Sequence, residues 1–338
     1  MAAEIAEQPA AWSRLLDGAG RDGASGLDRA AALVREHSPR FVLLAARGTS
    51  DHAALYAKYL VEIRLGLPAG LVSPSTLTAY RARPDLRDVL LVAVSQSGGS
   101  PDLLACVQTA REQGALTVAV TNAAASPLAR AAHAHVDVLA GPERAVAATK
   151  TYTAQLLALH LLLARVLGET GDAAAALPGL GAEVLEAAPG PVSELATRFR
   201  FVQRLVTTGR GYAYPTAREA ALKLMETAYV SAQAFSGADL LHGPLALVDP
   251  LVPVLAVASP GAGGDAMVPV LESLAARHAD VARIGGDGAA VPLPPVPDEA
   301  LAPLLEILPL QLLAHDVAVA RGGDPDAPRG LAKVTETL

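Results

Sequence analysis

Short, unbroken runs of apolar residues alternate with helical patterns along this chain, and this alternation is the strongest constraint on its fold. The runs FVLLAA (41–46), VLLVAVS (89–95) and LTVAVTN (116–122) contain no charged residue, which is typical of strands buried on both faces of a sheet. Helical patterns follow, as in 101–113 and 149–169. Strands separated by helices predict a parallel sheet covered by helices on both faces.

The same order of patterns recurs in the second half of the chain. RLVTTGRGYAYPTAREAALKLMETA (204–228) mirrors FVLLAARGTSDHAALYAKYLVE (41–62), because each has an apolar strand, a loop with Arg-Gly and an Ala-rich helix. VPVLAVASP (252–260) then takes the place of VLLVAVSQS (89–97). We therefore predict an internal duplication of two α/β units.

These patterns also predict the domain boundaries. Residues 1–40 form a helical lead-in, 41–170 the first α/β unit and 193–323 the second. The segment 171–192 is rich in Gly, Pro and Ala, so we predict a linker with room for one helix. The remaining residues, 324–338, form a polar tail.

Composition argues against several functional classes. Lys and Arg total 27 and Asp and Glu total 34, so the net charge of −7 does not favour binding to nucleic acid or to a membrane surface. Cys106 is the only cysteine, which excludes an internal disulfide and a cysteine-based zinc site. The N-terminus lacks a signal-peptide pattern, and the apolar segment 156–163 is too short to cross a bilayer. We expect a cytoplasmic protein with no metal and no other cofactor.

The strand at 89–95 ends in a burst of small polar residues, SQSGGS (95–100), directly before a helix that begins at Pro101. In an open parallel sheet, ligands bind beyond the carboxyl ends of the strands, where the N–H groups of the next helix favour an anion. Hydroxyl and amide groups can donate to phosphate oxygens, and glycines let the backbone come close. The absence of a P-loop lysine and of GxGxxG disfavours nucleotides. The alternative is an ordinary turn with Ser100 as the helix N-cap.

Charged residues of the predicted helix PTAREAALKLMETA (215–228) share one face, because Glu219, Lys223 and Glu226 are spaced i, i+4 and i+7. One interpretation is a solvated ladder of salt bridges. The other is that Glu226 is a base and Lys223 holds or tunes it. Aldose–ketose isomerisation needs such a carboxylate to move a proton between C1 and C2.

SQSGGS after a buried strand resembles the phosphate-binding loop of the SIS (sugar isomerase) family, commonly written SQSGET. The chain is similar, over nearly its whole length, to the isomerase part of glucosamine-6-phosphate synthases and to stand-alone SIS-type glucosamine-6-phosphate deaminases. The other matching segments are ARGTS (46–50), ERAVAATKTYTAQL (143–156), GRGYAYPTAREAALKLMETAY (209–229), DLLHGPLALV (239–248), PLQLLAH (309–315) and PRGLAKVTETL (328–338). The resemblance implies two SIS subdomains, each a five-stranded parallel sheet flanked by helices in a flavodoxin-like, three-layer α/β arrangement, and a homodimer.

The resemblance also implies roles for individual residues. Glu226 matches the family's base and Lys223 its partner, whereas Glu219 is expected to be structural. His242 matches the ring-opening acid/base, which the neighbouring subunit supplies. Lys333 lies in the tail expected over the active site and matches a lysine that can form an imine with the open-chain sugar. The positions around the sugar 6-phosphate and in a nearby loop are matched by Ser95, Gln96, Ser97, Ser100, Thr49 and Ser50.

Two positions depart from the synthase pattern. Gly99 stands where the loop commonly carries Glu, and Ala148 stands where a Ser precedes the Thr-Lys pair. These changes leave the identity of the sugar open. For Glu143 and Lys150, in the patterned segment 143–156, we expect packing or helix capping rather than chemistry.

Three functions are compatible with this pattern. The first is conversion of glucosamine 6-phosphate to fructose 6-phosphate and ammonia, by ring opening and abstraction of the C2 proton. Residues 1–40 leave no room for a glutamine-hydrolysing domain that would supply ammonia, which favours deamination as the net direction. The second is dehydration of N-acetylglucosamine 6-phosphate by β-elimination of the C3 hydroxyl. The third is a non-catalytic sugar-phosphate sensor.

Overall fold

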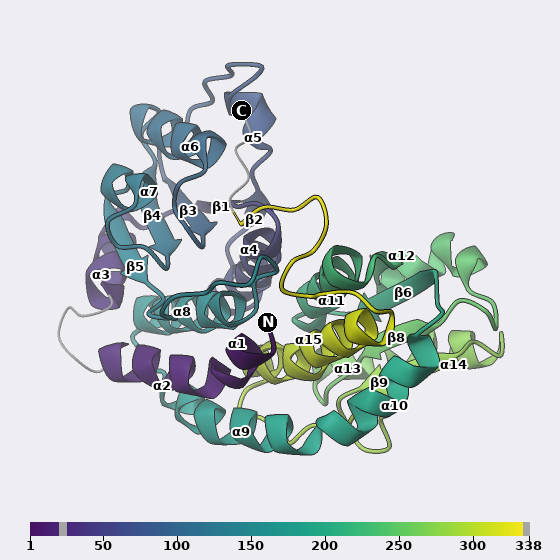
Figure 1. Ribbon diagram of the computed structural model, residues 1–338. Coiled ribbons are helices and arrows are strands. Elements are labelled where there is room, and N and C mark those ends of the chain that lie inside the picture. The colour runs from purple at the N-terminus through teal and green to yellow at the C-terminus, as the bar shows by residue number, and fades with distance from the viewer. Residues whose placement is uncertain (20–25, 334–338) are drawn as a thin grey trace. The chain divides into compact units, whose positions relative to one another are not determined.

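A computed structural model describes residues 1–19 and 26–333 as an α/β protein with two parallel sheets (Figure 1). The chain divides into two compact units, each built around one sheet. The β1–β5 unit comprises Ala10–Glu143, Lys150–Ala175 and the tail from Ala332, and the β6–β9 unit comprises Met1–Pro9, Arg144–Thr149 and Ala176–Leu331.

The first sheet has the strand order β2-β1-β3-β4-β5, and all its pairs are parallel. This is the order of flavodoxin-like folds, as predicted. Its strands are β1 (Phe41–Ala45), β2 (Ala69–Leu71), β3 (Val89–Ser95), β4 (Leu116–Thr121) and β5 (Ala134–Asp137). The helices are α2 (Gln8–Ala19), α3 (Leu27–His37), α4 (Thr49–Leu60), η1 (Val61–Leu65), α5 (Pro74–Leu77), α6 (Pro101–Glu112), α7 (Pro127–Ala131), α8 (Lys150–Leu167) and η2 (Asp172–Ala176).

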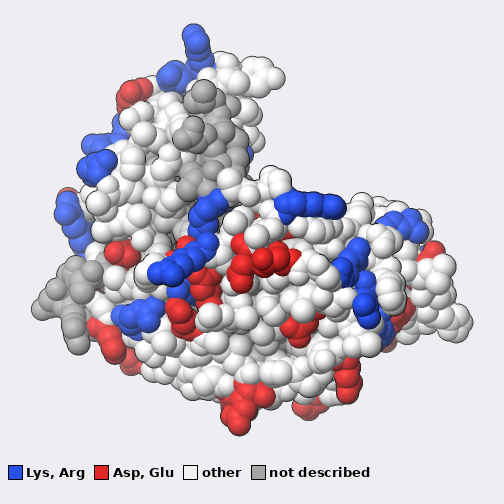
Figure 2. All heavy atoms as spheres, viewed as in Figure 1, with Lys and Arg blue, Asp and Glu red and all other residues white. Residues whose placement is uncertain are grey.

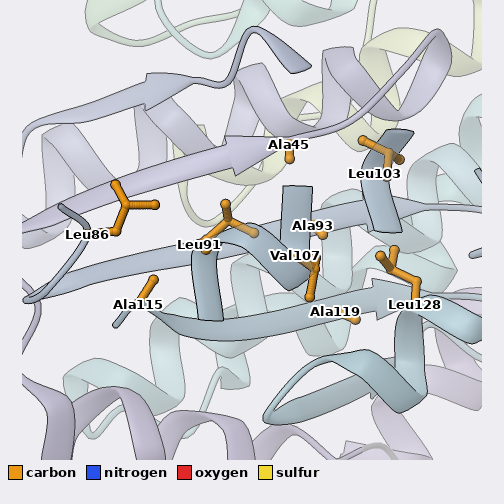
Figure 3. Close-up of a cluster of buried hydrophobic side chains, with 10 residues drawn as sticks. Ala45, Leu86, Leu91, Ala93, Leu103, Val107, Ala115, Ala119 and Leu128 are labelled. Carbon is orange, nitrogen blue, oxygen red and sulfur yellow. The ribbon is translucent and has the colours of Figure 1, made fainter. Parts of the chain in front are cut away.

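Small residues on the central strands let helix α6 pack closely on the first sheet. Figure 3 shows Leu103 and Val107 of α6 in one buried cluster with Ala93 of β3, Ala119 of β4 and Leu91. Side chains without voids between them are needed for a stable core. Aromatic residues make up only 4% of the chain, so this core is filled by Leu and Val side chains of the helix that pack against Ala side chains of the strands.

The second sheet has the parallel order β7-β6-β8-β9, which repeats the order of the first four strands of the first sheet. The repeat confirms the prediction of two similar α/β units. The strands are β6 (Arg204–Gly209), β7 (Ser231–Ser236), β8 (Val254–Val257) and β9 (Val281–Ile284). The helices are α1 (Ala2–Ala6), α9 (Leu177–Ala187), α10 (Pro189–Phe199), α11 (Ala213–Ala228), α12 (Gly237–Leu241), η3 (Pro244–Leu247), α13 (Ala262–Asp265), α14 (Val268–Ala275), η4 (Glu299–Leu301) and α15 (Ala302–Ala320).

The predicted fifth strand of the second sheet is absent from the described residues, where the sheet has four strands. At the place of a fifth strand, Val291 makes a single parallel bridge to Ile284 of β9. The next residues, PLPPVP (292–297), include four prolines. Proline has no backbone N–H and cannot continue a ladder of hydrogen bonds, so the pairing stops after one bridge.

The segment predicted as a linker, 171–192, is largely helical, with η2, α9 and the start of α10. Pro178 and Pro189 lie in the first turns of α9 and α10. At these positions the missing proline N–H would have no partner within the helix in any case. In this segment the prolines therefore begin helices and do not indicate an irregular linker.

The helical run Glu299–Ala320 is long and apolar enough to cross a membrane, with a mean hydropathy of 1.3, and 78% of its most apolar window is buried. Within the β6–β9 unit, α15 packs against α11, α10 and α9 (Figure 1). These contacts make it a core helix. It has no distinct polar face, and its buried residues include Glu306 and Gln311 as well as apolar side chains, which reflects neighbours on several sides.

Acidic and basic side chains are interspersed on the face shown in Figure 2. On that face, neither sign covers an extended surface among the described residues. A mixed surface of this kind is typical of a protein with a small net charge and gives little electrostatic attraction to a polyanion.

Candidate active site

The serine loop after β3 is held in a tight turn by its own side chains. Ser95, at the end of the strand, is buried, and its Oγ accepts a hydrogen bond from the N–H of Gly98 at 3.1 Å. Ser97 Oγ accepts a longer one, 3.3 Å, from the N–H of Gly99. Gly98 has a φ of +61°, a conformation that favours glycine. The backbone therefore doubles back at the carboxyl edge of the sheet.

The helix after this loop begins without a side-chain cap from Ser100, whose hydroxyl makes no capping hydrogen bond. The carboxylate of Asp102 takes part in the first turn instead, because its Oδ1 accepts from the N–H of Leu103 at 2.8 Å. Its Oδ2 accepts from Nε of Arg47 at 2.7 Å. Ser100 is therefore the N-cap residue of α6 by position, since its carbonyl accepts from the N–H of Leu104 at 3.1 Å, but its hydroxyl is not committed to capping.

Thr49 and Ser50 lie in the first turn of α4, which follows the short loop after β1, the neighbour of β3 in the sheet. The two strands pair in parallel up to Ala45 and Ala93, so both loops leave the same edge of the sheet. Ser50 is buried, and its Oγ accepts a hydrogen bond from Nε2 of Gln155 in α8 at 3.1 Å. The Arg47–Asp102 ion pair joins the two loops directly. The structure thus brings the predicted phosphate-binding residues onto one edge.

The tail residue Lys333 belongs to the same unit as the serine loop. Its Nζ lies 3.6 Å from Oε2 of Glu143, a side chain that is 0% exposed. The rest of the predicted tail, residues 334–338, lies outside the described residues.

In the β6–β9 unit, helix α11 aligns Glu219, Lys223 and Glu226 as their spacing predicts. Lys223 Nζ lies 3.2 Å from Oε1 of Glu219 and 2.5 Å from Oε2 of Glu226. The side chains of Glu219 and Lys223 are 0% exposed, whereas that of Glu226 is 22% exposed. A solvated ladder is therefore wrong for this cluster. It is a buried ion pair with one accessible carboxylate.

The buried cation of this cluster stays protonated. Burial favours the neutral amine, but the carboxylates of Glu219 and Glu226 outweigh it and raise the pKa of Lys223. Lys223 therefore does not act as a base near neutral pH. Its Nζ donates a hydrogen bond to Oε2 of Glu226 and so fixes the direction of that carboxylate.

His242 follows α12 directly and is exposed. Its N–H donates to the carbonyl of Asp239 at 3.0 Å, and Gly243 follows with a φ of +123°. The turn of Gly243 and Pro244 fixes the backbone at this point. The imidazole is presented outward on this chain, where a ligand or a second molecule can reach it.

A family model described as SIS domain matches residues 37–165 and 199–320. The chain belongs to the SIS domain family. The first match covers strands β1–β5 and the second covers β6–β9, so each SIS domain contains one of the two sheets. The serine loop lies in the first SIS domain, and Lys223, Glu226 and His242 lie in the second.

Curated relatives and solved structures agree with this family. The SIS chain is 37% identical to a glutamine–fructose-6-phosphate aminotransferase of Methanothermobacter thermautotrophicus, over 98% of this chain and 56% of that protein. It spans about half the length of the curated relatives that it matches.

Among solved structures, a Silicibacter pomeroyi DSS-3 protein provisionally assigned as a phosphosugar isomerase is 38% identical, with a TM-score of 0.86 over 96% of this chain and 98% of that one. The C-terminal domain of glucosamine-fructose-6-phosphate aminotransferase from Francisella tularensis is 29% identical, with a TM-score of 0.84 over 96% of each chain. Glucosamine-6-phosphate deaminase of Thermotoga maritima, at 22% identity and a TM-score of 0.77 over 97% of this chain and 99% of that one, shares the fold.

Sequence reasoning missed the side chains that hold the SIS loops in place. Arg47 with Asp102, and Gln155 with Ser50, were assigned no role. The carboxylate of Glu143, for which packing or capping was expected, accepts from Nε2 of Gln96 at 2.9 Å. A charged residue in an otherwise apolar or small-residue stretch was the available signal for each carboxylate.

Two histidines at the start of β5, His133 and His135, contact threonines of β4. The ring Nδ1 of His133 lies 2.9 Å from Thr117 Oγ1, and Nε2 of His135 lies 2.9 Å from Thr121 Oγ1. Burial lowers the pKa of both rings, and Arg111 adds to the effect at His133. These contacts fit packing of the sheet.

Proposed function

We propose that this SIS protein is an aminosugar-6-phosphate isomerase that releases ammonia, converting glucosamine 6-phosphate and water to fructose 6-phosphate and ammonia. The observation that carries the proposal is the Lys223–Glu226 pair. The fully buried ammonium of Lys223 orients the accessible carboxylate of Glu226. Such a carboxylate is suited to move a proton between two adjacent carbons.

The phosphate of the substrate is assigned to the loops that follow β1 and β3. Ser95, Gln96, Ser97 and Ser100, with Thr49 and Ser50, offer hydroxyl and amide donors at one sheet edge. The N-terminus of α6 adds partial positive charge near these donors, whereas the charge of the Arg47 guanidinium is balanced by its ion pair with Asp102. A phosphate dianion is therefore a better occupant than a neutral group.

The reaction follows from the assigned groups. His242 moves the proton of the C1 hydroxyl to the ring oxygen as the bond between C1 and that oxygen breaks and the sugar ring opens. Glu226 removes the proton at C2 and returns it at C1, while one proton passes from the amine to the C1 oxygen, which leaves a ketose imine at C2 and a hydroxyl at C1. Water adds to C2 and ammonia leaves, so that one water is consumed for each ammonia released. Lys333 is assigned to the open-chain carbonyl, with which its amine can form an imine.

This assignment of His242 requires a homodimer. Three leucines close to His242 in the sequence, Leu241, Leu247 and Leu251, are 37%, 44% and 85% exposed. Large apolar side chains left exposed are common at interfaces. We propose that a second copy covers them and that His242 serves the active site of that copy.

The names of the relatives support an aminosugar substrate. The Methanothermobacter protein is a glutamine–fructose-6-phosphate aminotransferase, and the Francisella domain comes from a glucosamine-fructose-6-phosphate aminotransferase. Both names join fructose 6-phosphate to a nitrogen transfer. Deamination of glucosamine 6-phosphate connects the same sugar phosphates.

The decisive experiment supplies glucosamine 6-phosphate and its N-acetyl form in parallel and follows ammonia, fructose 6-phosphate and the mass of the sugar phosphate. Ammonia and fructose 6-phosphate in equal amounts, from the free amine alone, are expected. A product lighter by one water from the N-acetyl sugar, without ammonia, would replace the proposal with a dehydratase. Binding without turnover of either sugar would replace it with a sensor or with an enzyme for another amine-linked sugar phosphate.

A further inference from the structure

The carboxylate of Glu143 is fully buried, with 0% of its side chain exposed, although it lies in the loop between β5 and α8. Burying a carboxylate is costly unless donors surround it. Oε1 accepts a hydrogen bond from the N–H of Thr151, in the first turn of α8, at 3.2 Å. Oε2 accepts from Nε2 of Gln96 at 2.9 Å and lies 3.6 Å from Nζ of Lys333. One side chain thus contacts a helix start, the serine loop and the tail.

The contact with Glu143 fixes the orientation of the Gln96 amide. A carboxylate only accepts, so the NH₂ end of Gln96 must face it. The backbone of Gln96 is also fixed, since its carbonyl accepts from the N–H of Asn122 at 3.1 Å. With one Nε2 hydrogen committed to Glu143, the second remains to donate to another acceptor. A substrate phosphate in the serine loop would be that acceptor.

The contact with Lys333 uses the same carboxylate oxygen. Lys333 is 28% exposed, and a long side chain at this exposure samples many rotamers unless a partner restrains it. The charge of Glu143 supplies that restraint. Gln96 and Lys333 both contact Oε2 of Glu143. The same carboxylate oxygen therefore orients the Gln96 amide and positions the Lys333 ammonium.

We propose that Glu143 is a positioning residue. Its Oε1 anchors the carboxylate to α8, and its Oε2 turns the Gln96 amide toward the substrate phosphate and holds Lys333 beside the same loop. The inference rests on the proposed function for the identity of the substrate. It goes beyond that function by adding a residue that touches neither the phosphate nor the sugar.

The test uses Glu143→Gln in the full chain, because glutamine keeps the shape of the side chain and one acceptor oxygen for Thr151. If the oxygen of the introduced glutamine faces Thr151, its NH₂ group faces Gln96. The Gln96 amide must then turn its oxygen toward residue 143, and its NH₂ group no longer has its wild-type orientation. The negative charge opposite Lys333 is also lost. The first readout is calorimetric titration with inorganic phosphate, which needs no turnover. Glu62→Gln is the control, because Glu62 forms a surface pair with Lys58 in the same unit.

The affinity for phosphate is expected to fall at least about tenfold in Glu143→Gln and in Gln96→Ala, the size of one hydrogen bond to a charged group. The double variant is expected to bind no more weakly than Gln96→Ala, because both changes remove the same contact. Glu62→Gln should bind as the wild type does. Wild-type affinity in Glu143→Gln, or additive losses in the double variant, would overturn the role toward Gln96.

The second readout is the kinetics with glucosamine 6-phosphate. For Glu143→Gln, kcat is expected to fall about 10- to 100-fold through misplacement of Lys333, with an unchanged Tm. Adding this change to Lys333→Met should lower kcat no further. A residue that only caps α8 would change Tm and leave KM and kcat alone. If the wild type releases no ammonia, the proposed function fails, whereas the phosphate titration still decides the role of Glu143 toward Gln96.

Discussion

Nζ of Lys223 lies 2.5 Å from Oε2 of Glu226, and of this pair only the carboxylate reaches solvent, with 22% of its side chain exposed. An ion pair with one open side is suited to chemistry, because the buried partner holds the accessible one without covering it. The buried carboxylate of Glu219 also lies within ion-pair distance of the Lys223 ammonium and helps to stabilise its charge. Stability and reactivity are therefore divided between two glutamates that lie about two helical turns apart.

Replacement of Glu226 by glutamine is expected to lower kcat for ammonia release by about 10²- to 10⁴-fold, the usual contribution of a general base. The Tm should stay close to that of the wild type, because the side chain keeps its size and is partly exposed. Glu186→Gln, at an exposed position of α9, is the matched control. Full activity of Glu226→Gln would rule out this residue as the base.

Replacement of Lys223 by methionine is expected to lower the free energy of unfolding by about 3–5 kcal/mol. The change removes the cation from Glu219, whose side chain is 0% exposed, and leaves a buried carboxylate without that charge. Urea denaturation of Lys223→Met beside Glu226→Gln measures the difference. Equal stability of the two variants would mean that Glu219 does not depend on the buried ammonium.

Gly98 and Gly99 are adjacent but differ in the room around them. A Cβ at Gly98 would lie 2.3 Å from Oγ of Ser126, on a backbone with φ of +61°, whereas a Cβ at Gly99 would find nothing closer than 3.6 Å. We expect Gly98→Ala to cost about 1–3 kcal/mol of stability and Gly99→Ala less than about 0.5 kcal/mol. Chemical denaturation of both variants checks this, and a similar loss for both would contradict the described loop.

The thiol of Cys106 is expected to be unreactive in the folded protein. Burial raises its pKa to about 11, and the neighbouring Asp102 carboxylate contributes to the rise. Because the thiolate is the reactive form, a thiol reagent at pH 8 should label the chain only after unfolding. Labelling within minutes under native conditions would show that α6 opens or that the thiol is more accessible than described.

Glu306 predicts a pH dependence of stability. Burial raises its pKa to about 7 from the usual 4.5, against hydrogen bonds from Ser259 and Thr216. The native state therefore holds this proton more tightly than the unfolded chain does, so the stabilisation is complete below about pH 4.5 and is lost as pH rises through about 7. Glu306→Gln cannot ionise. The Tm of Glu306→Gln minus that of the wild type should therefore increase between about pH 5 and pH 8. A Tm difference that does not change with pH would count against this assignment.

Much of the fold could be predicted from the pattern of apolar residues. The run 89–95 coincides with β3, and 101–113 and 149–169 lie within two residues of α6 and α8 at each end. Strands β2, β7 and β9 were missed for a common reason. β2 has three residues, AGL, β7, SAQAFS, alternates apolar and polar residues, and β9, VARI, contains an arginine, so none presents an unbroken apolar run of strand length. Their positions depend on pairing with β1, β6 and β8, which the local sequence does not encode.

The candidate site divides in the same way. Helical spacing placed Glu219, Lys223 and Glu226 on one face, but only tertiary packing decides which of the three is exposed. The order of Ser and Gly after β3 indicated an anion site. The contact of Gln96 with Glu143 joins residues 47 positions apart in the chain and could not be read from either segment alone.

The proline run after Val291 has a consequence for association between molecules. An exposed sheet edge can recruit a strand from another copy and so begin fibrous aggregation. The chain that lies next to β9 offers one bridge and then four residues without a backbone N–H. A strand arriving there from outside would find too few donors to extend the ladder. The prolines that end the pairing beside β9 thus also protect this edge of the second sheet from pairing with other molecules.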